Sequence, residues 1–274
     1  MKDKAQISIA LWFDKEAKEA MHFYASAFPN SQVNHSDTVV TTATLSGVKF
    51  TGINGGTAFR PNPAISFMVT LETKEEIDTI WKKLLPGGKI LMALDKYPWS
   101  DYYGWLEDRY GVSWQLYLGN LKDVIGQQIV PTLLFTQEQN GKCEEAVEFY
   151  QSVFPTFHKF GILRHQDGEL SGKVQHTQFS ANNFLLMAMD GGLAHNFAFN
   201  EGVSLVVHCD NQEDIDYYWN AFTHQGKESM CGWCKDPYGV SWQVIPKGIE
   251  KMLQNPKATT ALLKMKKIII NELK

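Results

Sequence analysis

The chain has 274 residues, of which 44% are hydrophobic and 20% charged, with a net charge of -4. This balance excludes a disordered or collagen-like chain and a basic surface for nucleic acid. At about 150 residues per domain, the length predicts two domains. The N-terminus lacks the apolar stretch of a signal peptide, and no run approaches the ~18 apolar residues of a membrane span. We therefore expect a soluble cytoplasmic protein with no nucleic-acid or membrane partner.

The predicted elements of the first half alternate between strand and helix. An apolar stripe on a helix over Ala17–Phe28 and a Thr73-x-x-Glu76 capping box mark two helices. The strands are expected at Ile7–Phe13, Val39–Thr44, Val48–Ile53, Ile65–Leu71 and Ser113–Leu118. This order predicts two successive β-α-β-β-β modules.

The second half repeats this order. Helices are expected at Cys143–Phe154 and around Ile215–Phe222. The strands are expected at Pro131–Phe135, Val174–Ser180, Phe184–Met189 and Val203–Cys209. The sequence therefore predicts an α+β fold of four βαβββ modules with mostly antiparallel, curved sheets and a C-terminal helix.

Recurring motifs show that the two halves are copies of one unit. Three motifs occur twice in the same order, which indicates a duplication with loop insertions. They are Phe23–Pro29 and Phe149–Pro155, Trp81 and Trp219, and Gly104–Gln115 and Gly232–Gln243. We place the first domain at 1–122, the second at 129–248 and a tail at 249–274.

The tail carries lysines and apolar residues on a predicted helix over Lys257–Leu273. A basic amphipathic helix can lie on a membrane surface. Docking onto the protein's own body is the preferred interpretation, because the rest of the chain is acidic.

Several of these segments resemble PhnB-like proteins of the glyoxalase/bleomycin-resistance, or vicinal oxygen chelate, superfamily. The resemblance is carried by Ala10–Asp14, Glu19-Ala20, Phe23-Tyr24, Phe28-Pro29, the repeated Gly-Trp-x-x-Asp-x-Tyr-Gly-Val-Ser-Trp-Gln motif and Met265–Ile268. It implies tandem pairs of βαβββ modules whose curved sheets enclose a pocket. It also brings the label 3-demethylubiquinone methyltransferase-like. The glycine pairs at 55–56, 87–88 and 191–192 lack the spacing of a cofactor loop between strand and helix, so we do not expect literal methyl transfer.

Enzymes of the superfamily usually bind a divalent metal through His, Glu or Gln on facing strands. The resemblance places the usual glutamate at Gln115 and Gln243, and the usual histidine near Ser66 and Ser204. Neutral amides and hydroxyls are poor ligands for such metals. We therefore predict no cofactor, with a divalent metal as the alternative.

The predicted ligand pockets use matched residues of the two copies. Because Trp114 and Trp242 are expected to pack against helices, the residues beside them should face the concave side. The predicted lining residues are Trp105, Ser113, Gln115, Cys231, Trp233, Ser241 and Gln243. The alternative is that Trp105 and Trp233 pack in the core.

Two further residues have competing interpretations. His176 lies on a predicted pocket strand, opposite Thr42 in the other copy, and is the candidate general base or ligand partner. The alternative is a sheet histidine bonded to a backbone carbonyl. Cys231-x-x-Cys234 has the spacing of a redox or zinc half-site, but no second pair accompanies it, which favours structural cysteines.

These observations predict a metal-independent protein that binds a small hydrophobic or aromatic molecule. The alternative is a metal-dependent lyase, isomerase or dioxygenase whose ligands include His176. Convergence of His176, Gln243 and a carboxylate within ligand distance would favour it. A third possibility is a structural interaction module. Because the duplication supplies two units in one chain, we expect a monomeric pseudo-dimer or a homodimer.

Overall fold

The computed structural model of the chain describes residues 5–274. Module one consists of β1 (Gln6–Phe13), α1 (Ala17–Ala27), β2 (Gln32–Ser36), β3 (Val40–Leu45) and β4 (Val48–Asn54). Module two consists of β5 (Ile65–Leu71), α2 (Lys74–Leu84), β6 (Lys89–Tyr97), β7 (Ser100–Glu107) and β8 (Ser113–Leu118). Module three consists of β9 (Ile129–Thr136), α3 (Cys143–Val153), β10 (Phe157–Arg164), β11 (Val174–Ala181) and β12 (Phe184–Gly192). Module four consists of β13 (Val203–Cys209), α4 (Gln212–Thr223), β14 (Lys227–Glu228), β15 (Trp233–Lys235) and β16 (Ser241–Pro246). The four predicted modules are confirmed.

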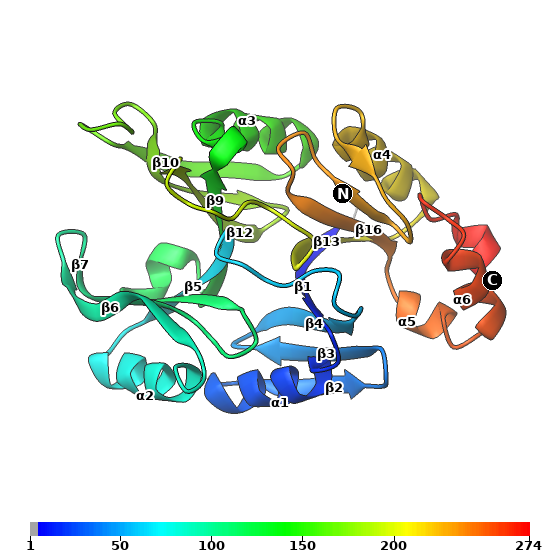
Figure 1. The fold of residues 1–274 in the computed structure, drawn as a ribbon. Coiled ribbons are helices and arrows are strands. Elements are labelled where there is room, and N and C mark those ends of the chain that lie inside the picture. The colour runs from blue at the N-terminus through cyan, green and yellow to red at the C-terminus, as the bar shows by residue number, and fades with distance from the viewer. Residues whose placement is uncertain (1–4) are drawn as a thin grey trace.

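The strands form two eight-stranded sheets. Sheet A has the order β14-β15-β16-β13-β1-β4-β3-β2, and sheet B has the order β10-β11-β12-β9-β5-β8-β7-β6. Within every module the first strand pairs in parallel with the last, and the other pairings are antiparallel. Helices α1 and α2 lie at one end of the molecule and α3 and α4 at the other (Figure 1).

Each sheet combines one module from each repeat. Antiparallel pairing of β1 with β13 joins modules one and four in sheet A, and pairing of β5 with β9 joins modules two and three in sheet B. Each sheet therefore contains strands from both sequence repeats, and each repeat contributes strands to both sheets.

Two loops that link modules hold the repeats together reciprocally. Asn62 donates from Nδ2 to the carbonyl oxygen of Ala198 at 3.0 Å, and Asn200 donates from Nδ2 to that of Arg60, also at 3.0 Å. Each loop therefore anchors the other at equivalent positions of the two repeats.

The duplicated Gly-Trp motif is explained by a buried carboxylate. Asp108 accepts hydrogen bonds from the Tyr24 hydroxyl at 2.7 Å and from Trp114 Nε1 at 2.8 Å. It also accepts from the backbone N–H groups of Tyr110 and Val112. In the second repeat, Asp236 makes the same four contacts with Tyr150, Trp242, Tyr238 and Val240. The motif thus fixes the turn before β8 and β16 to the first helix of its repeat.

Short helices follow the last strand of each repeat at equivalent positions. After β8 comes the 3₁₀ helix η1 (Leu121–Val124), and after β16 comes α5 (Ile249–Met252). Leu121 and Val124 pack on sheet B, whereas Ile249 and Met252 pack against the main core.

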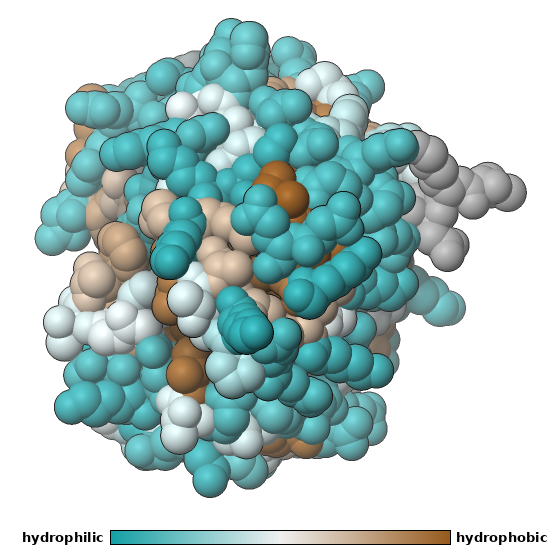
Figure 2. All heavy atoms as spheres, turned by 90° about the vertical axis from the view of Figure 1, so that its right-hand side faces the viewer, coloured by the Kyte–Doolittle hydropathy of each residue, from teal (hydrophilic) through white to brown (hydrophobic). Residues whose placement is uncertain are grey.

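The tail differs from the single helix predicted over Lys257–Leu273. It contains α6 (Pro256–Leu262), an irregular segment and the 3₁₀ helix η3 (Ile270–Leu273). The irregular segment pairs with the chain before β15, because Cys231 and Gly232 donate their backbone N–H groups to the carbonyl oxygens of Met265 and Lys266, both at 2.7 Å. Ile268 is fully buried. The tail therefore docks on the protein body, and no helix within residues 5–274 could span a membrane. Seen from the side that carries the tail, the surface is mostly hydrophilic with smaller hydrophobic areas (Figure 2).

Candidate functional site

The predicted site residues separate into two sets on different sheets. Trp105, Ser113 and Gln115 lie on sheet B, on which His176 also lies. Trp233, Ser241 and Gln243 lie on sheet A. The predicted orientation holds for the tryptophans beside them, because Trp114 and Trp242 are fully buried in the main core on the helix side. The glutamines consequently point to the outer face of each sheet, which is the face away from the helices.

On the outer face of sheet B, the polar side chains are bonded to one another. Gln115 donates from Nε2 to Ser66 Oγ at 2.6 Å, and its Oε1 accepts from the Tyr103 hydroxyl, also at 2.6 Å. Trp105 donates from Nε1 to Ser113 Oγ at 2.7 Å. These bonds fix the orientation of the Gln115 amide and of the Trp105 ring.

An apolar cluster surrounds this polar network on the same face. It is separate from the main core and contains Met68, Tyr103, Val124, Val130, Leu185 and Met187, with Met92, Tyr97, Trp105, Tyr117 and Leu121 packed against it. Methionine and aromatic side chains present adaptable apolar surfaces to ligands. We call this set the sheet B cluster.

The sheet B cluster continues into a surface recess of about 570 Å³. Trp99 is 52% exposed and stacks on Tyr97, with ring centroids 5.0 Å apart, and both rings contact Tyr103 edge-on. Both also line the recess, together with Tyr117. Beside Tyr117 in register, the buried Thr70 hydroxyl has no hydrogen-bond partner. Sequence reasoning missed Tyr97 and Trp99, because the segment that carries them has no match in the other repeat.

The outer face of sheet A carries smaller and more polar residues. Gln243 donates from Nε2 to Ser204 Oγ at 2.9 Å, and His208 Nε2 lies 2.8 Å from Ser8 Oγ. Trp233 packs edge-on against Trp12, with ring centroids 5.8 Å apart. The Ser241 hydroxyl has no partner, although Ser113, its counterpart on sheet B, accepts from a tryptophan.

His176 and Cys231 are placed differently from the other candidates. His176 points to the outer face of sheet B by alternation with the core residue Phe179, and burial lowers its pKa. The hairpin register aligns it with Val40, so Thr42, the predicted counterpart, corresponds to Gln178. Cys231 lies against the tail, with Sγ 3.5 Å from the carbonyl oxygen of Leu262.

The four cysteines are free thiols in the structure. Cys234 is buried in the main core, whereas Cys231 faces the tail. Burial raises the pKa of the Cys231 thiol, which disfavours its reactive thiolate form. The arrangement agrees with structural cysteines.

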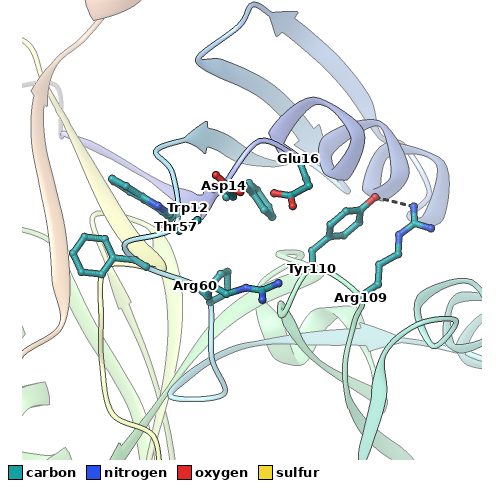
Figure 3. Close-up of a pocket in the computed structure, with 10 residues that line it drawn as sticks. Trp12, Asp14, Glu16, Thr57, Arg60, Arg109 and Tyr110 are labelled. Carbon is teal, nitrogen blue, oxygen red and sulfur yellow. Dashed lines mark hydrogen bonds between the residues drawn. The ribbon is translucent and has the colours of Figure 1, made fainter.

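A further cavity of about 240 Å³ lies at the end of β1 in the first repeat (Figure 3). Its walls combine aromatic rings with both signs of charge: Trp12, Phe13, Asp14, Glu16, Thr57, Phe59, Arg60, Pro61, Arg109 and Tyr110. We call it the β1 cavity. Arg60 and Asp14 have no charged counterparts in the second repeat. This difference between the copies is the signal in the sequence that could have revealed the β1 cavity.

The predicted positions for a superfamily metal do not fit a divalent ion. At each one a neutral amide is bonded to a serine hydroxyl, Gln115 to Ser66 and Gln243 to Ser204. The oxygen of the Gln115 amide, its better metal donor, already accepts from Tyr103. Within residues 5–274 no group of three or more His, Cys, Asp or Glu side chains is placed to hold a metal.

The fold is that of a glyoxalase-like protein. A glyoxalase I variant from Zea mays matches over 89% of this chain and 94% of its own, with a TM-score of 0.56 and 12% identity. A provisionally assigned dioxygenase from Bacillus subtilis matches over 90% of this chain and 87% of its own, with a TM-score of 0.52 and 10% identity. At these identities the matches show the fold alone.

The sequence places the chain within a family. The family model described as 3-demethylubiquinone-9 3-methyltransferase matches twice, at residues 5–117 and 127–245, so the chain belongs to this family. The PhnB protein of Bacillus cereus, itself provisionally assigned as such a methyltransferase, is 42% identical over 41% of this chain and 98% of its own, with a TM-score of 0.38. No functionally curated protein matches the sequence. The predicted PhnB-like family and superfamily are confirmed.

Proposed function

We propose that the chain binds a small aromatic or apolar organic molecule on the outer face of sheet B, without a metal ion. The observation that carries this proposal is the sheet B cluster, an apolar and aromatic surface separate from the main core that opens into the recess at Tyr97 and Trp99. Ligand sites of this kind combine apolar walls with a few fixed polar groups.

The aromatic residues form a continuous path from Trp99 and the edge strand β6 to Tyr103 on the neighbouring strand β7. Trp99 stacks on Tyr97 at an interplanar angle of 24°, and the edge of Tyr103 follows at 5.7 Å from Tyr97. Such offset and edge contacts are the arrangements that aromatic rings prefer. Because Trp99 is about half exposed, one face of this path is available to a planar ligand.

The polar groups of the site suit a ligand with one hydrogen-bonding group. Gln115 is held by Tyr103 and Ser66, so its amide keeps one orientation. The Thr70 hydroxyl, buried without a partner, can donate to or accept from a ligand. A buried polar atom without a partner costs about 1–3 kcal/mol, so a ligand that supplies the missing bond gains affinity.

The two other activities considered have less support from the geometry. His176 lies on sheet B and Gln243 on sheet A, so these two predicted ligands do not converge on one metal. The glycine pairs end β4, lie between α2 and β6 and end β12, and in none of these places does a glycine loop join a parallel strand to the helix that follows it. We therefore do not extend methyl transfer from the family's description to this chain.

Binding of 1-naphthol, followed by tryptophan fluorescence and calorimetry, tests the proposal. Trp99→Ala, at an exposed site, should weaken binding about tenfold or more and leave thermal stability unchanged. Tyr217→Ala is the matched control, because Tyr217 is 47% exposed on α4, away from sheet B. Equal affinities in the wild type and the Trp99 variant, or an equal loss in the control, would refute this site.

A further inference from the structure

The β1 cavity is built in the first repeat and filled in the second. Alignment of the two loops on Asn62 and Asn200 places Ala198 opposite Arg60 and Phe199 opposite Pro61. Phe199 packs edge-on against Phe135, with ring centroids 5.1 Å apart. The second repeat thus closes this place with an aromatic ring, whereas the first leaves a cavity of about 240 Å³.

Two of the charges around the cavity are confined to the first repeat. Asp14 corresponds to Thr136, whose hydroxyl is bonded to the carbonyl oxygen of Phe197 at 2.6 Å. Arg60 corresponds to Ala198. Figure 3 shows the Arg60 guanidinium across the cavity from the carboxylates of Asp14 and Glu16. The cavity is therefore bounded by two cations, Arg60 and Arg109, and two anions, Asp14 and Glu16. Of these, Asp14 and Arg60 are replaced by uncharged residues in the second repeat, so the duplicated unit does not need them for folding.

Most polar groups of the wall are occupied by the protein itself. Trp12 donates from Nε1 to the carbonyl oxygen of Gly56 at 2.7 Å. Tyr110 donates to Glu19 at 2.7 Å, and Arg109 donates to Tyr110 and Glu19. No hydrogen bond or ion pair within the described residues engages the side chains of Asp14 or Arg60. These two side chains are left to interact with a ligand.

We infer that the β1 cavity binds a free α-amino acid with an apolar or aromatic side chain. The Arg60 guanidinium matches a carboxylate with two parallel N–H donors. The Asp14 carboxylate matches an ammonium group, together with the Glu16 oxygen that does not already accept from the backbone N–H of Lys15. The rings of Trp12 and Phe59 accept the apolar side chain. The volume is below the ~300–1,000 Å³ of pockets for drug-sized molecules, which suits a ligand of this size. This site is separate from the proposed site on sheet B.

A ligand with a single charge fits the cavity less well. An anion alone would lie close to the carboxylates of Asp14 and Glu16, and a cation alone would lie close to the guanidinium groups of Arg60 and Arg109. Like charges a few ångströms apart repel, most strongly where water is partly excluded. A zwitterion pairs both signs at once, so affinity should depend on both charged groups of the ligand.

Calorimetry on the full chain with L-phenylalanine as the probe tests this site. We expect one binding site per chain in the wild type. Arg60→Ala and Asp14→Thr, which introduce the residues of the second repeat, should each weaken binding about tenfold or more. N-acetyl-L-phenylalanine and phenethylamine, which each lack one charge, should bind at least tenfold more weakly. Lys18→Ala is the matched control for loss of an exposed charge and should bind as the wild type does.

The outcomes separate this inference from the proposed function. Pro61→Phe, which mimics Phe199, should abolish L-phenylalanine binding and leave 1-naphthol binding unchanged, whereas Trp99→Ala should do the reverse. Absence of saturable L-phenylalanine binding, an unchanged affinity in Arg60→Ala, or equal binding of N-acetyl-L-phenylalanine would overturn the inference. Retained 1-naphthol binding in every cavity variant shows that these proteins are folded and that only the cavity has been tested.

Discussion

The side-chain amide of Gln115 donates to the hydroxyl of Ser66 across 2.6 Å, and Gln243 repeats this bond to Ser204 at 2.9 Å. These are the positions at which the superfamily resemblance places metal ligands. Each glutamine amide is hydrogen-bonded to its serine, so the two side chains at these positions are occupied by each other. A ligand on either face therefore meets a fixed amide edge.

Metal removal should leave the protein unchanged. A metal that binds the folded chain at one hundred times its Kd adds about 2.7 kcal/mol to the free energy of unfolding and raises the Tm by several degrees. We expect no such shift with micromolar zinc, nickel or manganese, and none after chelation. Elemental analysis of protein purified without an affinity tag completes the measurement. One metal ion per chain, or a shift of several degrees, would contradict metal-independent binding.

The buried carboxylate of the Gly-Trp motif should be essential for stability. Asp108→Asn places an amide N–H₂ against a site where four donors converge, so we expect a loss of about 3 kcal/mol in the free energy of unfolding. Chemical denaturation measures it. Asp101→Asn, at an exposed surface ion pair with Lys96, is the control and should be neutral. Similar losses in both variants would show that the four-donor site has no special role.

The pH dependence of stability should include a contribution from His176. Burial lowers its pKa in the folded state, so the folded protein binds this proton less readily than the unfolded chain does. The contribution of His176 to the free energy of unfolding is therefore complete above the unfolded-state pKa of about 6.5, and it is lost as the pH falls towards the folded-state pKa. Burial lowers the pKa of His208 in the same way.

His176→Gln should flatten the fall in the free energy of unfolding between pH 7 and pH 5. Asp108 and Asp236 act with the opposite sign, because burial raises the pKa of each to about 6 and the folded state takes up protons first. They are present in both proteins, so the difference between variant and wild type isolates the histidine. His22→Gln, at an exposed position, is the control. Parallel curves for the His176 variant and the wild type would refute the assignment.

The repeated motifs were sufficient to predict the modules but not how they pair. Self-similarity identifies which segments are alike, and periodicity identifies strands and helices. Which module shares a sheet with which depends on the pairing of β1 with β13 and of β5 with β9, and neither strand edge has a local sequence signal. The pairing of these strands is determined by tertiary packing, because the strands have similar compositions.

The candidate site shows the same limit. The orientation of Gln115 followed from alternation with Trp114, which is a local property of a strand. The recess at Trp99 and the cavity at Arg60 lie in loops and edge segments, where the copies differ and no period applies. The differences between the copies, rather than their shared motifs, contain this information.

The tail should be a structural part of the second repeat. Ile268 is fully buried and packs against Gly232, which has φ +83° and where an added Cβ would lie 2.9 Å from the Ile268 side chain. Ile268→Ala should therefore lower the free energy of unfolding by about 2–4 kcal/mol, since it removes buried apolar atoms and leaves a cavity. Leu263→Ala, in the same segment but 65% exposed, is the matched control and should change stability by less than about 0.5 kcal/mol. Chemical denaturation of both variants is the measurement, and equal stability of the two would show that the tail does not dock in solution.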